Sequence, residues 1–161
     1  MEKVWLAVGG VVVNQSGDWL VVKKKYGGLK GKWSIPAGFV KQGETVDEAI
    51  IREVREETGV EAKVVGLIGV RTGVIHDEIS DNMLIFLLSA LSETVTVQTE
   101  ELFEAAFLPK GRIQKDEDTS KLLLHLSELN SFTILNPVHD VNPGNHFGYT
   151  KYHLYLKNSK N

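Results

Sequence analysis

Short apolar runs recur along the first 110 residues, and most of them have the length and composition of β-strands. The runs typical of strands are residues 3–13, 18–25, 62–71, 83–91 and, at an edge of the sheet, 94–98. The turn-forming run NQSG between the first two predicts a hairpin. A polar connection is expected over residues 72–82.

Two other segments repeat their apolar residues at the 3.6-residue period of an α-helix. The first covers residues 45–58, and the second covers 118–129, with Asp118 or Thr119 as its N-cap. Residues 102–108 fit either a strand or a helix. Because strands, a hairpin and helices interleave, we expect an α/β (α+β) fold with a mixed sheet covered by helices.

The length and composition suit one compact domain. The chain has 161 residues, of which 42% are hydrophobic and 24% are charged, so it has enough apolar surface to exclude a wholly disordered protein. Residues 1–161 are therefore read as a single domain. Its last part, 131–161, is broken by Asn and Pro and ends in a predicted strand, FGYTKYHLYL. We expect this extension to have one of three roles: it completes the sheet, pairs with a second subunit or covers a substrate.

Charge and cysteine content exclude several classes of protein. With 18 basic and 21 acidic side chains, the chain lacks the strongly basic balance of a duplex-binding protein. With no cysteine, it has no disulfide, thiolate zinc site or cysteine nucleophile, which fits the cytoplasm as its location. We expect no membrane span, because no apolar run approaches about 20 residues. The apolar start VWLAVGGVVV resembles a signal peptide, but its β-branched residues favour a strand.

The sequence contains capping signals at both ends of the helix predicted at 45–58. Thr45 and Glu48 have the spacing of a capping box, in which each side chain satisfies a free backbone N–H group of the other. Gly59 stands where a left-handed C-cap falls. The boundaries fix which side chains share a face.

Three glutamates of this helix lie on one side at a spacing of three and four residues: Glu53, Glu56 and Glu57. They continue the apolar stripe that should face the protein body, whereas Arg55 and Thr58 lie opposite. Crowded, partly buried carboxylates repel each other and need partners, and a hard divalent cation with oxygen ligands removes the repulsion. The alternative is an ordinary solvated helix face.

The stretch GFVKQGETVDEAIIREVREETGV, residues 38–60, resembles a complete Nudix box, and the preceding WSIPAG resembles its usual lead-in. The resemblance implies a Nudix fold, an α/β/α sandwich on a mixed sheet, with a core at about residues 3–130. It also implies a Nudix hydrolase that uses Mg²⁺ or Mn²⁺. The reaction is hydrolysis of a nucleoside diphosphate linked to another moiety, by attack of water on phosphorus.

The resemblance also assigns roles by position in the box. The implied metal ligands are Glu53, Glu56, Glu57 and the Gly38 carbonyl oxygen. Arg52 would position Glu53, and either Glu53 or Glu57 would act as the general base. Glu44 and Gly59 would be structural.

In some relatives the base or a further ligand lies in a later loop. The candidates here are Glu100, Glu101 and Glu104. Contacts to substrate phosphate are expected from Lys24, Lys25 and Arg71, all outside the box.

The expected partner is a small nucleotide-type molecule, with a second copy of the chain as a further candidate. Signatures of the subclasses selective for ADP-ribose, diadenosine polyphosphates and coenzyme A are not evident, and the lack of cysteine argues against the isoprenyl diphosphate isomerases. Two alternatives stay open. One is a nucleotide-sensing module without turnover, and the other is an RNA 5′-end pyrophosphohydrolase. The sequence names neither the nucleoside nor the leaving group.

Overall fold

The computed structural model describes residues 3–157. The strands are β1 (Val4–Val13), β2 (Trp19–Lys24), β3 (Trp33–Ser34), β4 (Ala37–Phe39), β5 (Ala62–Ile75), β6 (Ile79–Ala90), β7 (Leu102–Leu108), β8 (Asn136–Val138) and β9 (Leu154–Leu156). The helices are α1 (Val46–Thr58), α2 (Lys110–Lys115) and α3 (Lys121–Glu128), with a 3-10 turn, η1, at Asn145–Phe147.

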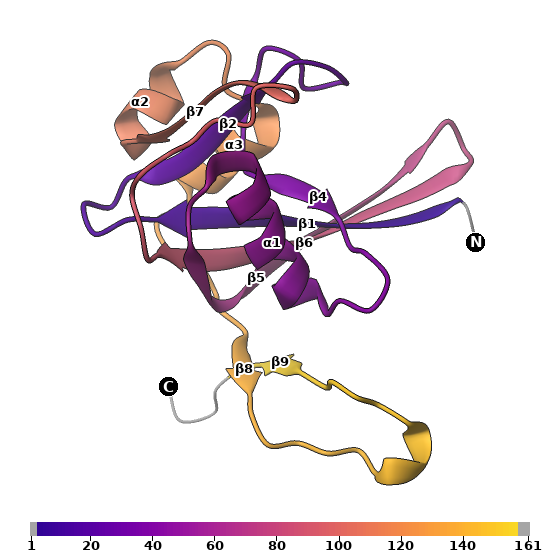
Figure 1. Ribbon diagram of the computed structural model, residues 1–161. Coiled ribbons are helices and arrows are strands. Elements are labelled where there is room, and N and C mark those ends of the chain that lie inside the picture. Colours follow the sequence, from indigo (N-terminus) through magenta and orange to yellow (C-terminus); the bar gives the residue numbers. More distant parts are fainter. Residues whose placement is uncertain (1–2, 158–161) are drawn as a thin grey trace.

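Seven strands form a mixed sheet in the order β3-β2-β1-β6-β5, with β4 paired to β1 and β7 paired to β2 (Figure 1). The long strands β1 and β6 run parallel, and the other pairs are antiparallel. The predicted hairpin between the first two strands is confirmed, with Val13 opposite Trp19. The predicted mixed sheet is therefore correct.

Helices cover both faces of this sheet. On one face, Ile50 and Val54 of α1 pack in an apolar cluster with Val8, Val12 and Phe86 of the central strands. On the other face, Ile113 of α2 and the α3 leucines Leu123 and Leu126 pack in a second cluster, which also contains Trp19, Val21 and Trp33. The fold is thus the α/β/α sandwich that the resemblance implied.

Two of the sequence-based boundaries are wrong. Residues 72–82, expected as a polar connection, are the ends of β5 and β6 and the tight turn between them. This hairpin projects past the helices, so it lacks the buried face that produces an alternating pattern (Figure 1). Residues 94–98 form no strand: Thr96 N donates to Thr58 O at 2.8 Å and Gln98 N to Glu57 O at 3.1 Å, so these backbone groups close the end of α1.

The helical region after β7 also differs in detail. Residues 102–108, ambiguous in the sequence, are a strand at the far edge of β2. The short α2 was not predicted, because its six residues carry only one buried apolar side chain, Ile113. The next helix begins later than expected: Ser120, and neither Asp118 nor Thr119, is its N-cap, with the Ser120 side chain accepting from Leu123 N.

The C-terminal extension forms a small hairpin of its own, β8–β9, at one end of the main sheet (Figure 1). Of the predicted terminal strand, only Leu154–Leu156 forms a strand in the structure, and it pairs with β8. Leu135 bonds to Leu67 of β5 through both backbone groups, at 2.8 and 2.9 Å. Tyr155 packs edge-on against Phe86, with 5.6 Å between the ring centroids. Within the described residues, no helix combines the length and apolarity needed to cross a membrane.

Candidate functional site

Helix α1 begins and ends where its capping residues predict. Thr45 is the N-cap, and its backbone N–H donates to Glu48 Oε1 at 2.9 Å, as a capping box requires. Gly59 adopts the left-handed conformation, with φ of 73°, and its N–H donates to Arg55 O at 2.8 Å. The register of the carboxylates on the helix is therefore well defined.

The three glutamates of α1 differ in exposure. Glu57 is 3% exposed, and the side chains of Glu53 and Glu56 are 14% and 52% exposed. Glu53 lies directly against Gly38 of β4, because a Cβ added there would overlap its carboxyl group. Two of the three carboxylates thus turn toward the protein body, next to the backbone of β4, and the third lies at the surface.

Arg52 connects the loop before the helix to two of these carboxylates. Its guanidinium donates to both oxygens of Glu44, at 2.5 and 3.0 Å, and Nη2 also donates to the Phe39 carbonyl at 3.1 Å. Nη1 donates to Glu53 at 2.9 Å and to Glu56 at 3.1 Å. The hydrogen bonds from Arg52 lower the pKa of Glu44. These contacts are those that a positioning role for Arg52 and a loop-holding role for Glu44 require.

The buried carboxylates are poorly solvated. Burial raises the pKa of Glu57 to about 8, with the opposing charge of Lys24 working against it. Lys24 Nζ lies 3.9 Å from Glu57 Oε1, and Glu57 Oε2 has no hydrogen-bond partner among the described residues. Burial also raises the pKa of Glu53, against the hydrogen bond from Arg52. A buried carboxylate oxygen without a partner is costly unless a cation binds it.

The carboxylate and carbonyl oxygens at this site are of the type that binds a hard divalent cation, although in this structure they are not grouped around one point. Among the described residues, no three His, Asp or Glu side chains lie close enough together to hold an ion. Glu56 contacts Arg52 and lies 3.9 Å from Lys41 Nζ. Glu53, Glu57 and the Gly38 carbonyl offer only oxygen atoms, the type of ligand that Mg²⁺ and Mn²⁺ take.

A cavity of about 440 Å³ opens beside Gly38 on the sheet face away from α1. Its polar lining includes Lys24, Arg71 and Asp81, and Arg71 bonds to Asp81 at 2.7 Å. Aromatic side chains line it as well: Trp5, Tyr26 and Phe39. A second cavity of about 670 Å³, under α3, shares Lys24, Ala37 and Arg71 with it. Positively charged side chains and aromatic rings thus line a hollow that borders the part of α1 with the three glutamates.

Of the other candidates from the sequence, Glu101 lies near this hollow. Beside burial, its charge raises the pKa values of both Glu57 and Tyr26, and Tyr26 lines the hollow. Glu100 is exposed in a turn. The Lys25 ammonium donates to the Thr99 carbonyl. Sequence reasoning did not select Tyr26, Phe39 or Asp81. The pairing of β1 with β4 and with β6 brings Phe39 and Asp81 together, and Tyr26 lies in the loop after β2.

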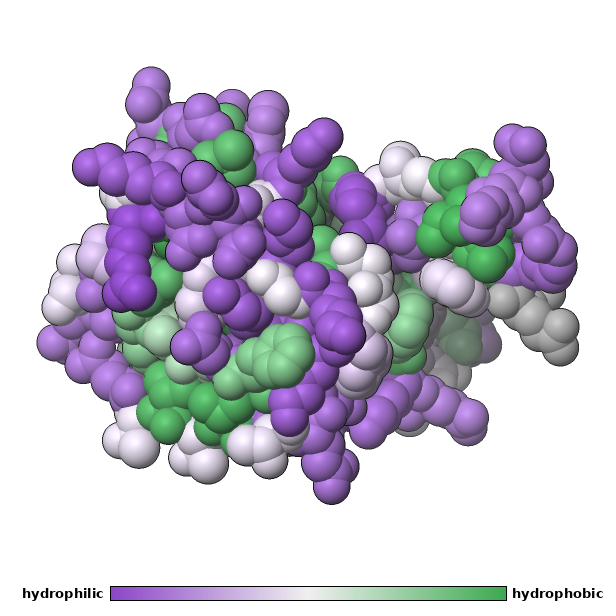
Figure 2. Space-filling model, turned by 90° about the horizontal axis from the view of Figure 1, so that it is seen from above, coloured by the Kyte–Doolittle hydropathy of each residue, from purple (hydrophilic) through white to green (hydrophobic). Residues whose placement is uncertain are grey.

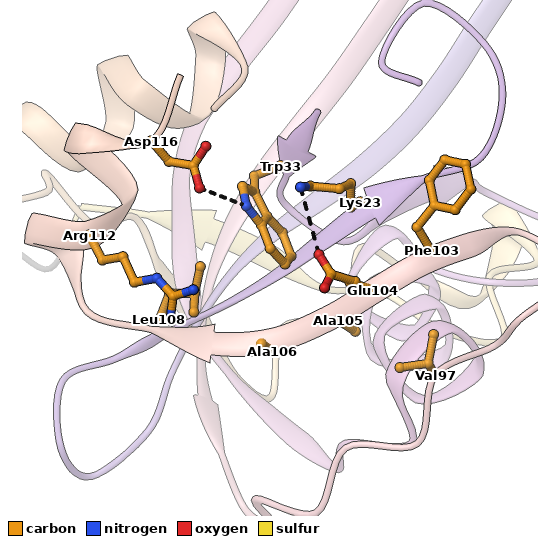
Figure 3. Close-up of a pocket in the computed structure, with 10 residues that line it drawn as sticks. All are labelled: Lys23, Trp33, Val97, Phe103, Glu104, Ala105, Ala106, Leu108, Arg112 and Asp116. Atoms are coloured by element: carbon orange, nitrogen blue, oxygen red, sulfur yellow. Dashed lines mark hydrogen bonds and ion pairs between the residues drawn. The ribbon is translucent and has the colours of Figure 1, made fainter. Parts of the chain in front are cut away.

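Glu104 lies in a different pocket, of about 320 Å³, formed by β2, β3, β7 and α2 (Figure 3). There its carboxylate is 3.6 Å from Lys23 Nζ, which lies over the Trp33 ring, and Trp33 Nε1 donates to Asp116 at 3.2 Å. Lys23 Nζ also lies 3.7 Å from Asp118, whereas Lys24, the next residue, lies near Glu57.

The family model described as the NUDIX domain matches residues 3–126. The chain belongs to the Nudix family. It is 35% identical over 107 residues to Nudix hydrolase 8 of Arabidopsis thaliana, covering 65% of this chain and 29% of that protein. It is 34% identical over 110 residues to an ADP-ribose pyrophosphatase of Methanocaldococcus jannaschii, covering 65% of this chain and 64% of that protein. The matches thus span less than two thirds of either Nudix relative.

Solved Nudix structures share the fold. A MutT NUDIX hydrolase from Burkholderia pseudomallei superposes with a TM-score of 0.69 at 20% identity, covering 80% of this chain and 99% of that one. The NUDIX domain of Shewanella oneidensis NrtR, solved with ADP ribose, gives a TM-score of 0.67 at 15% identity, covering 80% and 86%. The family match ends at residue 126, so residues 127–161 lie outside it.

Proposed function

We propose that this Nudix protein is a metal-dependent hydrolase that cleaves the phosphoanhydride bond of a nucleoside diphosphate linked to another moiety. The supporting observation is the pair Glu53 and Glu57, which lies next to a hollow lined by Lys24 and Arg71. Both glutamates are largely buried, and one carboxylate oxygen of Glu57 has no hydrogen-bond partner within residues 3–157. Such a pair is unfavourable in a purely structural role.

Glu53, Glu57 and the Gly38 carbonyl would hold Mg²⁺ or Mn²⁺, with Glu56 joining when its surface contacts to Arg52 and Lys41 are released. The bound ion supplies charge neutralisation at the diphosphate and a lower pKa for the attacking water. Arg52 holds Glu53 in position, because its Nη1 bonds to Glu53 while the rest of the guanidinium is fixed by Glu44.

The protein's own cations would bind the substrate. Lys24 and Arg71 line both cavities, and each can donate to phosphate oxygens, Arg71 once it releases Asp81. Glu57 or Glu53 accepts the proton of the attacking water as the bond to phosphorus forms and the anhydride oxygen leaves. Trp5, Tyr26 and Phe39 offer the aromatic surface against which a nucleoside can pack.

ADP-ribose belongs among the first substrates to test, since the names of two similar proteins mention it. The test set also contains sugar nucleotides, dinucleoside polyphosphates and 5′-triphosphorylated RNA. Products are separated by ion-exchange chromatography after incubation with Mg²⁺, Mn²⁺ or EDTA. We expect one group of substrates to be cleaved with either metal and none with EDTA.

Matched variants make the test specific. Glu53→Gln and Glu57→Gln should each lower kcat by about 100-fold or more, because each removes a charge that the proposed site needs. Glu61→Gln is the control: it lies just beyond the same helix and pairs with Arg55 at the surface, so its kcat should equal that of the parent protein. Metal-independent cleavage, or full activity in both variants, contradicts the proposal. Tight nucleotide binding without any product favours a sensing module instead.

A further inference from the structure

Strand β5 is one edge of the main sheet, and part of this edge is uncovered. The strand pairs with β6 on one side. On its other side, within residues 3–157, the bridge from Leu135 reaches it at Leu67. Beyond that point, from Gly69 to Ile75, no strand in the described part of the chain pairs with this outer side of β5. The β5–β6 hairpin also projects from the body of the molecule, as both views show (Figures 1 and 2).

One face of the uncovered segment carries two exposed valines, one on each side of Thr72. Val70 and Val74 are 61% and 68% exposed, and their side chains point the same way because they are four residues apart in a strand. The segment has no lysine and no proline, the residues with which proteins usually protect a free edge. A long exposed edge of this kind is a template for another strand.

The sequence of this segment, GVRTGVI, is complementary to itself when two copies run antiparallel with Thr72 opposite Thr72. Val70 then meets Val74 of the second copy on one face. On the other face each long side chain meets a glycine: Arg71 lies opposite Gly73 and Ile75 opposite Gly69. A Cβ added at Gly73 would meet nothing within 4 Å, so this space is free.

Charge is compatible with the same register. The two Arg71 guanidiniums would lie diagonally, opposite glycines and not opposite each other, and each is paired with Asp81 of its own chain at 2.7 Å. We propose that the protein forms a symmetric homodimer in which the β5 edges pair antiparallel about Thr72, joining the two main sheets into one. Because the two-fold axis uses the same edge on both copies, the assembly closes at two chains.

The first test measures mass. Size-exclusion chromatography with light scattering on the full chain should give twice the chain mass of 17.9 kDa at tens-of-micromolar concentration. Val70→Lys combined with Val74→Lys should give a monomer, because like charges would face each other across the pair. Val4→Lys is the matched control, since Val4 is equally exposed on the same face but lies in β1, on the other side of β6 from the β5 edge.

The second test locates the axis. The chain has no cysteine, so Thr72→Cys places one thiol in each copy at the point where the strands cross. Facing residues in antiparallel strands have Cα atoms about 5.5 Å apart, within reach of a disulfide. Mild oxidation should convert most Thr72→Cys protein to a covalent dimer, and far less of Val4→Cys. A monomeric parent protein, a dimer that survives the double lysine change, or equal cross-linking of the two cysteine variants overturns the proposal.

Discussion

At the scale of single residues, Gly38 sets the position of Glu53. A Cβ at Gly38 would occupy the space of the Glu53 carboxyl group. Gly38→Ala should therefore move that carboxylate and lower kcat by about 100-fold, the size expected when a reacting group shifts by about 1 Å. Enzyme assays at saturating substrate measure the effect, and circular dichroism confirms that the variant is folded.

The control for this prediction is Gly111→Ala. Gly111 lies in α2, and a Cβ there would meet nothing within 4 Å. We expect unchanged kcat and a stability gain of up to about 1 kcal/mol, because alanine is the better helix former. Equal kcat in the two alanine variants would show that Gly38 does not constrain Glu53.

Sequence alone could predict the residues on the helix, but not their exposure one by one. At 100° per residue, Glu57 lies about 40° to one side of Glu53, and Glu56 about 60° to the other. The buried face is centred toward Val54, so Glu56 lies outside it. The expected position of Thr58 opposite this face is wrong: Thr58 is buried, and its hydroxyl donates to Val54 O at 2.6 Å. Lys24 and Arg71 come to line the same cavities only through the tertiary packing of β2 and β5.

At the scale of elements, Arg52 fastens the loop after β4 to α1. Its planar guanidinium contacts Glu44, Glu53 and Glu56 at once. Arg52→Lys keeps the charge but loses the planar guanidinium, whose several N–H groups contact three carboxylates. It should therefore lower kcat more than tenfold while the thermal midpoint falls by only a few degrees. Rapid-quench kinetics and a thermal melt measure the two effects. If the variant kept its kcat, a positioning role for Arg52 would be excluded.

The start of α1 also holds the C-terminal extension. Lys151 Nζ bonds to both oxygens of Glu48 at 3.0 Å, and Tyr155 OH donates to Asp47 at 2.6 Å. Hydrogen bonds from the Thr45 backbone and from Lys151 lower the pKa of Glu48 from 4.5 to about 2. The link between the extension and the helix therefore depends on an ionised Glu48.

This link predicts a pH dependence with a definite sign. Because the pKa of Glu48 is lower in the folded protein, its contribution to stability is complete above pH 4.5 and is lost as the pH falls toward about 2. The difference in free energy of unfolding between parent and Glu48→Gln should shrink over that range. It should also shrink with added salt, since both side chains are partly exposed. Urea melts at several pH values test this, and a constant difference would contradict it.

The elements that sequence reasoning missed share a physical cause. The β5–β6 projection has no helix over it, and the 94–98 segment uses its backbone groups at the end of α1. In both cases the structure depends on distant parts of the chain: on where the helices lie over the sheet, and on which backbone carbonyls at the end of α1 still need a hydrogen-bond donor. The capped helix and the first hairpin were predictable because their signals are local: a capping box, a C-cap glycine and a four-residue turn.

At the scale of the whole molecule, the candidate site draws on both faces of one sheet. Glu57 lies on the side of α1, whereas the hollow of about 440 Å³ is lined by Ala7 and Met83, which belong to the apolar cluster on the side of α3. The two sides meet at β4, where Gly38 has no side chain to separate them. This arrangement lets a ligand in the hollow approach the turn of α1 without opening the core.

We expect the buried carboxylates to make the stability of the whole fold depend on metal. An ion that binds only the folded chain stabilises it by about 2.7 kcal/mol at a hundred times its dissociation constant, which for this size is a thermal shift of roughly 5–10 °C. We expect that shift with Mg²⁺ or Mn²⁺ in a fluorescence melt, and its loss in Glu57→Gln. In EDTA, Glu57→Gln should melt no lower than the parent at neutral pH, because glutamine is uncharged like the protonated carboxyl that burial favours there. Glu61→Gln should keep the full shift, and an equal metal shift in Glu57→Gln would place the ion elsewhere.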